Sequence, residues 1–373
     1  MTLRNDYRTR YINYFVRKYD RLTSRAIVNI VGGSAGANEE SERIKVLIGS
    51  TQVPNDEMNR ILGLGTIAPV AMVTTVYFKP PIRPIGVLGT PIGILMIDGS
   101  KTLYNLTTGT SATLPSRITS LAISPTGKIY VTSSENIYQY IAPGTFINMN
   151  VTGLVNITAL AVSSDETFYV LEDGSSEIYI AKRNSAAVVM AGSCAGYADG
   201  PGSTALFNNP KGLALDPTEQ FLYIADTFNS MIRQVVTTPP YMVTTLAGNT
   251  TLFNPTYPHI NPFPTDNVGN RDGNGLHGEN LLYEPHALSV SPNNVIYIAD
   301  TNNHNLRSLL NGTLTTIAGV HGSQPIYDVS PPGYIDGPST ESRWLYPISI
   351  SYYNSNVYVA EPLNFSVRAL TIL

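Results

Sequence analysis

Charge and cysteine are both scarce in this sequence. Asp, Glu, Lys and Arg make up 13% of the 373 residues, and the formal net charge is −4. Proteins that bind nucleic acids gain much of their affinity by neutralising phosphates with Lys and Arg, so this balance argues against a nucleic-acid partner. The only cysteine, Cys194, excludes an intramolecular disulfide and a cysteine-rich zinc or iron–sulfur site.

Long apolar runs are also missing. No run approaches the roughly 18 residues that a membrane span requires, so we expect no transmembrane segment. The first residues are rich in Arg and Tyr and contain no uninterrupted apolar stretch, which predicts that they are not a Sec signal peptide. Charged residues are depleted in the cores of protein interfaces, and the low charge therefore indicates a surface that partly lies against neighbours.

Three segments of the second half align with one another and define an internal repeat. They cover residues 199–235, 272–309 and 336–370, and each begins with Asp-Gly. In each segment an acidic residue precedes an arginine by seven positions, and an asparagine follows the acid by three. The acid and arginine pairs are Asp226 with Arg233, Asp300 with Arg307, and Glu361 with Arg368.

Each repeat has the composition of four short strands. A Gly-Leu-Ala-Leu type strand is followed by a turn such as Asp216-Pro217 and then by a β-branched and aromatic run such as residues 222–225. A third strand carries the arginine, and a fourth ends in Ala-Gly, for example at residues 247–248. Four short antiparallel strands in about 40 to 45 residues are typical of one β-propeller blade.

The pattern P-x-G-L-A-L-D…L-Y-I-A-D-T-x-N-x-x-I-R…T-T-L-A-G resembles the NHL repeat family of β-propellers. The match is close over residues 207–248, good over 282–319 and weaker over 344–373. Three earlier units, at 85–116, 117–153 and 157–192, keep the strand rhythm but lack the arginine, with Tyr140 and Tyr179 in its place in the last two. The resemblance implies an all-β, six-bladed propeller, with seven blades as the less favoured alternative.

The last repeat predicts how the ring closes. Only five residues follow Arg368, so this unit lacks its outermost strand, and an unclosed ring would expose free strand edges. Residues 26–33 resemble the missing strand, and we predict that residues 27–31 pair with residues 367–372. The resulting layout is an arm at 1–25, the closing strand at 26–33, a connecting segment at 34–80, and the propeller at 81–373 with an inserted loop at 249–281.

The first 25 residues form a short, basic and aromatic arm. Aromatic residues recur at three- and four-residue steps, which predicts a helix with one aromatic side beside a stripe of arginines. Tyr and Arg are enriched in protein interfaces, so the arm is predicted to dock on a protein partner, with an anionic membrane or nucleic acid second. The alternatives are a helix packed on its own propeller and a frayed tail. The predicted docking residues are Arg4, Tyr7, Arg8, Arg10, Tyr11, Tyr14, Phe15, Arg17, Tyr19 and Arg21.

The repeated acid and arginine pairs are predicted to be structural, because they recur at a fixed position in each blade. The Asp-Gly pairs at 199–200, 272–273 and 336–337 are interpreted as turns rather than calcium loops. All five histidines, His259, His277, His286, His304 and His321, fall in one stretch and are predicted to lie at one end of the propeller.

Some NHL-like enzymes, such as peptidyl-hydroxyglycine lyases, hold zinc in the channel with histidines from several blades. Here residues 85–192 contain no histidine, which argues against such a cage and leaves His286 and His304 as weak metal candidates. No motif predicts a catalytic residue or a cofactor.

The sequence leads to one functional hypothesis and two alternatives. The first is a non-catalytic propeller that acts as a protein-interaction or structural subunit of a larger assembly, such as a virion or another multi-subunit particle. Its partner would be a protein that contacts the arm and one propeller face. The second is a metal-dependent lyase or lactonase-type enzyme with its site at the channel, and the third is an RNA-binding NHL module.

Overall fold

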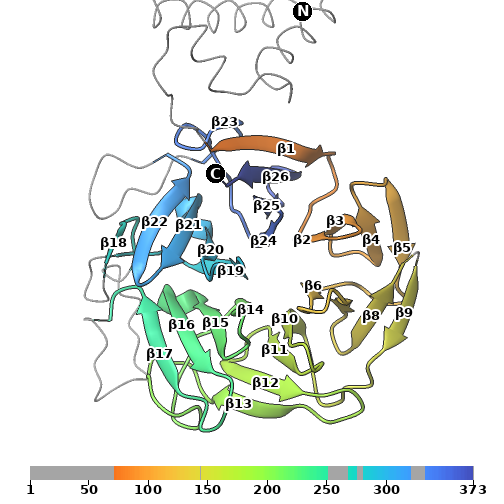
Figure 1. Ribbon diagram of the computed structural model, residues 1–373, viewed down its shortest axis with the longest axis vertical. Coiled ribbons are helices and arrows are strands. Elements are labelled where there is room, and N and C mark those ends of the chain that lie inside the picture. Colours follow the sequence, from red (N-terminus) through yellow and green to blue (C-terminus); the bar gives the residue numbers. More distant parts are fainter. Residues whose placement is uncertain (1–70, 143, 251–267, 275–279, 321–331, 373) are drawn as a thin grey trace, which may run out of the picture. The chain divides into compact units, whose positions relative to one another are not determined.

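A computed structural model describes residues 71–142, 144–250, 268–274, 280–320 and 332–372. Their strands form six antiparallel sheets that are arranged as the blades of a ring around a central channel (Figure 1). The expected all-β, six-bladed propeller is confirmed.

Each blade is a meander whose first strand lies at the channel and whose last strand lies at the periphery. Blade 1 is β2 (Gly86–Thr90), β3 (Gly93–Ile97), β4 (Thr102–Asn105) and β5 (Thr110–Thr113). Blade 2 is β6 (Ser120–Ile123), β7 (Ile129–Thr132), β8 (Ile137–Ile141) and β9 (Thr145–Asn148). Blade 3 is β10 (Ile157–Val162), β11 (Phe168–Glu172), β12 (Glu177–Ala181) and β13 (Val188–Gly192).

The last three blades carry additional elements. Blade 4 is β14 (Gly212–Leu215), β15 (Phe221–Asp226), the 3-10 turn η1 (Thr227–Asn229), β16 (Met231–Val236) and β17 (Val243–Ala247). Blade 5 is β19 (Pro285–Val290), β20 (Ile296–Asp300), η2 (Thr301–Asn303), β21 (Asn305–Leu310) and β22 (Thr313–Ala318), with β18 (Gly273–Asn274) paired outside β22. Blade 6 is β24 (Ser349–Tyr353), β25 (Asn356–Glu361), β26 (Ser366–Thr371), β1 (Met72–Phe78) and β23 (Gly337–Pro338).

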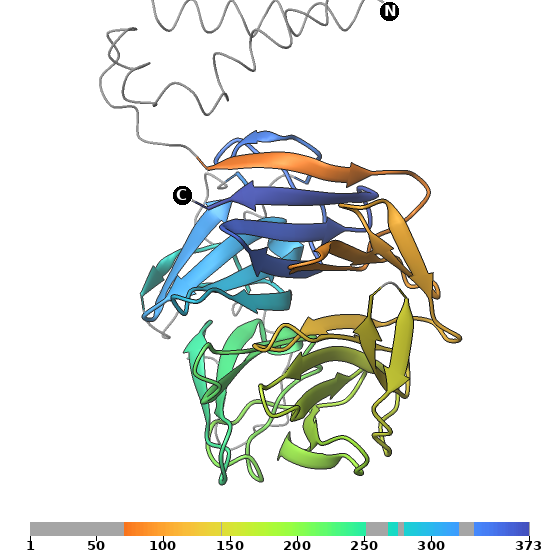
Figure 2. The ribbon, with the colours of Figure 1, turned by 45° about the vertical axis from the view of Figure 1, so that its right-hand side comes forward.

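The ring is closed by a strand from the N-terminal side of the propeller. β1 runs antiparallel to β26, with Val73 opposite Leu370, and Figures 1 and 2 show the two strands side by side. The other edge of β26 pairs with β25, so neither edge is free for the predicted pairing with residues 27–31. That prediction is wrong, and the connecting segment predicted at 34–80 ends in the closing strand. Residues 26–33 themselves lie outside the described residues.

The core is divided among the interfaces between blades. Six buried apolar clusters each join two neighbouring blades, and one of them packs Leu171 and Ile178 of blade 3 against Phe207 and Ile224 on the blade 4 side. β11, β15 and β20 are apolar almost throughout because a second strand is covered by other blades on both faces. Each innermost strand contacts those of both neighbouring blades, which fixes the channel wall.

The Ala-Gly endings of the repeats have a steric cause. Gly192 ends β13 with a φ of +92°, a conformation that side chains disfavour. A Cβ atom built on Gly192 would lie 2.3 Å from the carbonyl oxygen of Ser176, so any other residue would displace the backbone of the adjacent strand. Gly248, after β17, has a φ of +108° and a similarly close contact.

Candidate functional site

Blade 4 contains a buried ion-pair network centred on Arg233. One guanidinium nitrogen lies 2.7 Å from Oδ2 of Asp226, and both of these side chains are fully buried. A second nitrogen lies 2.7 Å from Oδ1 of Asp199, which comes from the connection that precedes β14. The guanidinium also donates to the carbonyl oxygens of Ala198 and Leu206, so this one side chain ties the blade 3–blade 4 connection to the blade.

The same network recurs in blades 5 and 6. Arg307 lies 2.8 Å from Asp300 and 2.6 Å from Asp272, and Arg368 lies 3.3 Å from Glu361 and 2.9 Å from Asp336. The structure thus brings together each acid and arginine that the repeat predicts as a pair. The inner acid of each network also accepts a backbone N–H, from Asn208 onto Asp226, from Tyr283 onto Asp300, and from Leu345 onto Glu361.

Burial is the main influence on these inner carboxylates. It raises the pKa of Asp226 and of Asp300, while the facing arginine and the hydrogen-bond donors oppose the rise. For Glu361 burial raises the pKa to about 7, and this carboxylate has the longest contact with its arginine. A buried acid in this setting depends on its arginine, because an unpaired buried charge is strongly destabilising.

Sequence reasoning missed the second acid of each network. Asp199, Asp272 and Asp336 were interpreted only as the first residues of Asp-Gly turns, yet each makes an ion pair with the arginine of its blade. The signal was present in the sequence, because each of these aspartates precedes the arginine of its blade by a similar interval.

Blades 1 to 3 have a tyrosine at the position of the arginine. Arg233 pairs across the sheet with Ile224, and the equivalent residues Tyr104, Tyr138 and Tyr179 pair with the matching positions of β3, β7 and β11. The sequence-based assignment of Tyr140 to this position is wrong, because Tyr140 pairs with Ile129, two residues before the matching Val131. The Tyr104 hydroxyl donates to Asp98, over 3.3 Å, and the Tyr179 hydroxyl donates to Glu177, over 2.6 Å. These blades therefore replace a buried ion pair with a tyrosine side chain.

The central channel has a volume of about 620 Å³ and is lined by the innermost strands of all six blades. Its wall is mainly aliphatic, with small hydroxyls that already accept backbone N–H groups, as Ser351 does from Gly89. Asp216 accepts the N–H groups of Thr218 and Phe221 within its own turn, and Lys211 pairs with Asp173. Besides Asp216 and Lys211, His286 is the one other acidic, basic or imidazole side chain on the described wall.

The two described histidines both contact Tyr346, and His286 also lies on the channel wall. The backbone N–H of Tyr346 donates to Nδ1 of His304 over 3.2 Å, and the Tyr346 ring lies edge-on to His286 with centroids 6.0 Å apart. Burial, with a smaller effect from Lys211, lowers the pKa of His286 to about 4, so its imidazole is neutral at neutral pH. Within the described ranges no three His, Cys, Asp or Glu side chains form a group that could hold a metal ion. His259, His277 and His321 fall outside those ranges.

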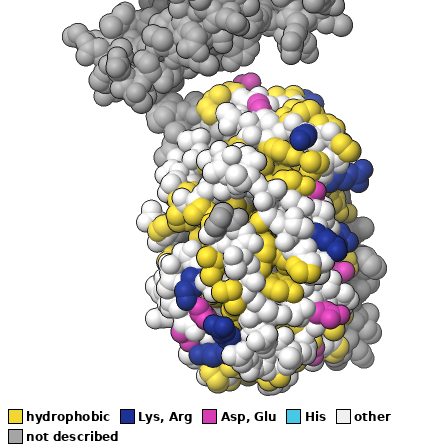
Figure 3. All heavy atoms as spheres, turned by 90° about the vertical axis from the view of Figure 1, so that its right-hand side faces the viewer, with side chains coloured by type: hydrophobic (Ala, Val, Ile, Leu, Met, Phe, Trp, Pro, Cys, Tyr) yellow, Lys and Arg dark blue, Asp and Glu magenta, His cyan; other side chains and the backbone are white. Residues whose placement is uncertain are grey.

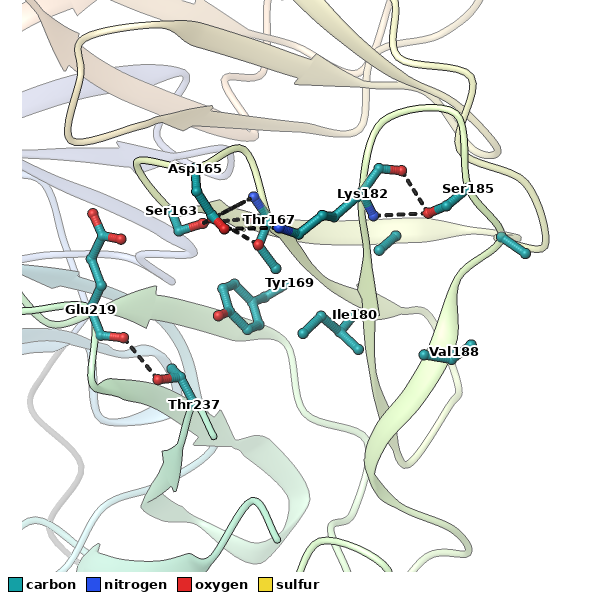
Figure 4. Close-up of a pocket in the computed structure, with 12 residues that line it drawn as sticks. Ser163, Asp165, Thr167, Tyr169, Ile180, Lys182, Ser185, Val188, Glu219 and Thr237 are labelled. Carbon is teal, nitrogen blue, oxygen red and sulfur yellow. Dashed lines mark hydrogen bonds and ion pairs between the residues drawn. The ribbon is translucent and has the colours of Figure 1, made fainter. Parts of the chain in front are cut away.

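A second cavity of about 480 Å³ opens between blades 3 and 4 (Figure 4). Its wall contains Asp165, Lys182, Tyr169 and Ile180 from blade 3 and Glu219 from the β14–β15 turn of blade 4. In Figure 4 the Tyr169 hydroxyl points toward the side on which Glu219 and Thr237 lie. Sequence reasoning did not find this cavity, which we call the interblade pocket, because none of its residues belongs to a recognisable motif.

The interblade pocket contains two carboxylates that differ in their partners. Asp165 makes an ion pair, and among the described residues Glu219 makes none. Oδ1 of Asp165 accepts the hydroxyls of Ser163 and Thr167, and Oδ2 lies 2.9 Å from Nζ of Lys182. These hydrogen bonds hold the pKa of Asp165 well below its usual range. Within the part of the chain that the structure describes, the Glu219 carboxylate accepts only the backbone N–H and hydroxyl of Ser164, over 3.0 to 3.1 Å.

The residues predicted for partner docking, Arg4 to Arg21, lie outside the described residues. Among the helices that the structure describes, none has the length and apolar character to cross a membrane.

Comparisons with known proteins agree with the repeat pattern. The family model of the NHL repeat matches residues 282–307, which run from the entry of β19 to Arg307. NHL repeat-containing protein 2 of Bos taurus is 32% identical over 115 residues, which are 31% of this chain and 13% of that protein. The chain therefore spans only a small part of this relative's length.

Solved structures share the fold at low sequence identity. A structural genomics protein of unknown function from Bacteroides thetaiotaomicron has a TM-score of 0.59 at 17% identity, over 81% of this chain and 76% of that one. A gluconolactonase from Xanthomonas campestris has a TM-score of 0.51 at 13% identity, over 81% and 90%. These structures share the fold alone, whereas the matched NHL repeat and the NHL repeat-containing relative support an NHL-repeat β-propeller.

Proposed function

We propose that this propeller is a non-catalytic protein-interaction or structural subunit of a larger assembly, and that residues 1–25 dock it on its partner. The observation that carries this proposal is the chemistry of the channel wall. In a propeller enzyme of the lyase or lactonase type, reactive groups would converge on the channel from several blades. Here the wall is aliphatic, and its few ionisable groups are engaged in turns and ion pairs or held neutral.

The remaining charged side chains of the blades support the same proposal. The three arginines at the repeat position are fully buried and paired, so they are not available to a substrate. On the outside, Figure 3 shows a flank of the propeller on which hydrophobic and uncharged side chains cover most of the surface and charged ones are scattered. Low charge with exposed apolar groups is typical of surfaces that contact other proteins.

In this proposal the arm supplies the main contacts with the partner protein. Its tyrosines and arginines are the residue types that dominate binding at protein interfaces, and it holds seven of the 23 basic residues of the chain. A virion or another multi-subunit particle is an assembly in which such a subunit would serve. The fold shared with the gluconolactonase does not transfer its activity, since propellers carry many unrelated functions.

Affinity purification with quantitative mass spectrometry tests the proposal. Tagged intact chain and a chain lacking residues 1–25 are expressed at equal levels in the native host, and both are checked for folding by circular dichroism. We expect a defined set of proteins to be enriched with the intact chain and to fall at least tenfold without the arm. Equal recovery with both versions would contradict docking through the arm.

A further inference from the structure

The contacts between neighbouring blades provide an internal template for the interblade pocket. At the interface of blades 2 and 3, the turn residue Glu166 accepts the hydroxyl of Tyr130 over 3.2 Å and pairs with the ammonium of Lys128. At the interface of blades 4 and 5, the Tyr223 hydroxyl donates over 3.2 Å to Asn294, which occupies the same turn position. In both cases a tyrosine of the second strand reaches an acceptor in the next blade.

The interface of blades 3 and 4 has the same tyrosine and the same turn glutamate but lacks the cation. Tyr169 corresponds to Tyr130, and Glu219 corresponds to Glu166; these two glutamates have φ values of +60° and +62°. The position of Lys128 is taken by Thr167, whose hydroxyl is bonded to Asp165. Among the described residues Glu219 makes no ion pair and the Tyr169 hydroxyl makes no hydrogen bond, and the pocket opens beside them.

The wall of the pocket suits a long side chain with a charged end. Ile180 and the exposed Val188 offer apolar surface for a methylene chain, and Glu219 and the Tyr169 hydroxyl offer acceptors for N–H donors. Burial, with Asp165 and Glu219 nearby, raises the pKa of Tyr169 to about 12, so the phenol is neutral at neutral pH. The Asp165–Lys182 pair contributes no net charge, which leaves Glu219 as the unbalanced charge of the wall.

We propose that the interblade pocket binds a lysine side chain of a protein partner, whose ammonium takes the place that Lys128 occupies in the preceding interface. The ammonium donates to the carboxylate of Glu219 and to the oxygen of Tyr169, and the methylene chain lies on Ile180 and Val188. This inference rests on the proposed function, because it assigns one contact by which the propeller recognises a protein.

Binding is measured on the full chain with the peptide acetyl-Gly-Lys-Gly-amide as probe, by following the methyl signals of Ile180 and Val188 in NMR titrations. The matched control is the same peptide with Nε-acetyl-lysine, which keeps the length of the side chain and removes its charge. We expect saturable shifts with the lysine peptide, and at least threefold weaker binding of the acetylated one.

Three variants locate the effect. Glu219→Gln keeps an acceptor for Ser164 and should weaken lysine binding at least threefold. Thr167→Lys supplies the missing cation from within the chain and should abolish binding. Glu166→Gln alters the equivalent turn residue whose place is already filled by Lys128, and it should leave binding unchanged.

No saturable shift with the lysine peptide in the unaltered chain would overturn the inference, as would binding that Glu219→Gln and Thr167→Lys leave intact. Failure here is distinct from failure of the proposed function. Loss of partners on removal of residues 1–25 would still support docking through the arm when the pocket binds no lysine. Conversely, lysine binding would stand if removal of the arm changed nothing.

Discussion

Blades 4 to 6 and blades 1 to 3 have the same strand order but are held by different side chains. Each of the later blades has a fully buried arginine between two acids, whereas each of the earlier ones has a tyrosine at the equivalent position. Blades 1 and 3 are intermediate, because Asp98 and Glu172 remain at the acid position. Asp98 accepts the N–H of Ser100 over 2.9 Å, and Glu172 accepts the N–H of Val155 over 2.6 Å. The fold therefore tolerates loss of the arginine in a blade whose acid still accepts a backbone N–H.

This comparison separates repeated residues from functional ones. A residue that recurs at one position in several blades is expected to serve the blade, as the arginines do. Residues that recur without the partner they have in another blade are better candidates for binding, as Glu219 and Tyr169 do without the cation that Lys128 supplies to Glu166.

Removing an arginine should give the largest effect. Arg307→Ala leaves Asp300 buried without its cation, and breaking a buried ion pair costs about 3 to 5 kcal/mol of unfolding free energy. Chemical denaturation measures the loss, with the exposed Arg183→Ala as control. The amount of partner protein bound per folded molecule should not change. An Arg307→Ala protein of unchanged stability that has lost binding would assign the network to function instead.

His286, the half-buried histidine of blade 5, should give the next effect, through the pH dependence of stability. Its pKa is lowered to about 4 in the folded chain, against an ordinary value near 6.5, so folding favours the neutral ring. The stabilisation is complete above pH 6.5 and is lost as the pH falls toward 4, by about 3 kcal/mol at most. An NMR titration of His286 should give a midpoint near 4, and His286→Ala should flatten the decline in stability. A midpoint near 6.5 would show that the ring is solvated.

Removing a tyrosine hydroxyl from the earlier blades should give the smallest effect. Tyr104→Phe deletes the hydrogen bond to Asp98 and keeps the ring, which should cost about 0.5 to 1.5 kcal/mol. Tyr179→Phe should behave alike. Denaturation curves of both variants beside Arg307→Ala measure the contrast between the two halves of the ring. A loss as large as that of the arginine variant would mean that the tyrosines carry equivalent networks.

The repeats could be predicted from sequence because their information is local. The interval between Asp226 and Arg233 and the strand composition around them recur at a fixed register, and this suffices to infer the blades and the pairs. The identity of the closing strand could not be inferred in this way. Residues 27–31 and 72–78 are both apolar and β-prone, and only long-range packing decides which one pairs with β26.

The interblade pocket depends on still longer-range information. Ser164 and Glu219 are 55 residues apart, and their contact is set by how blades 3 and 4 pack. This interface differs from the preceding one because Thr167 stands where Lys128 stands there. The two positions can be recognised as equivalent only when the two blades are compared in the structure.

The metal content of the purified chain tests most directly whether the channel carries out metal chemistry or the propeller acts through protein contacts alone. The full chain is purified without chelator and analysed by inductively coupled plasma mass spectrometry, beside a His286→Ala/His304→Ala variant. We predict zinc well below one equivalent in both proteins. Stoichiometric zinc in the unaltered chain that disappears in the variant would contradict the non-catalytic proposal and favour a metal-dependent lyase or lactonase.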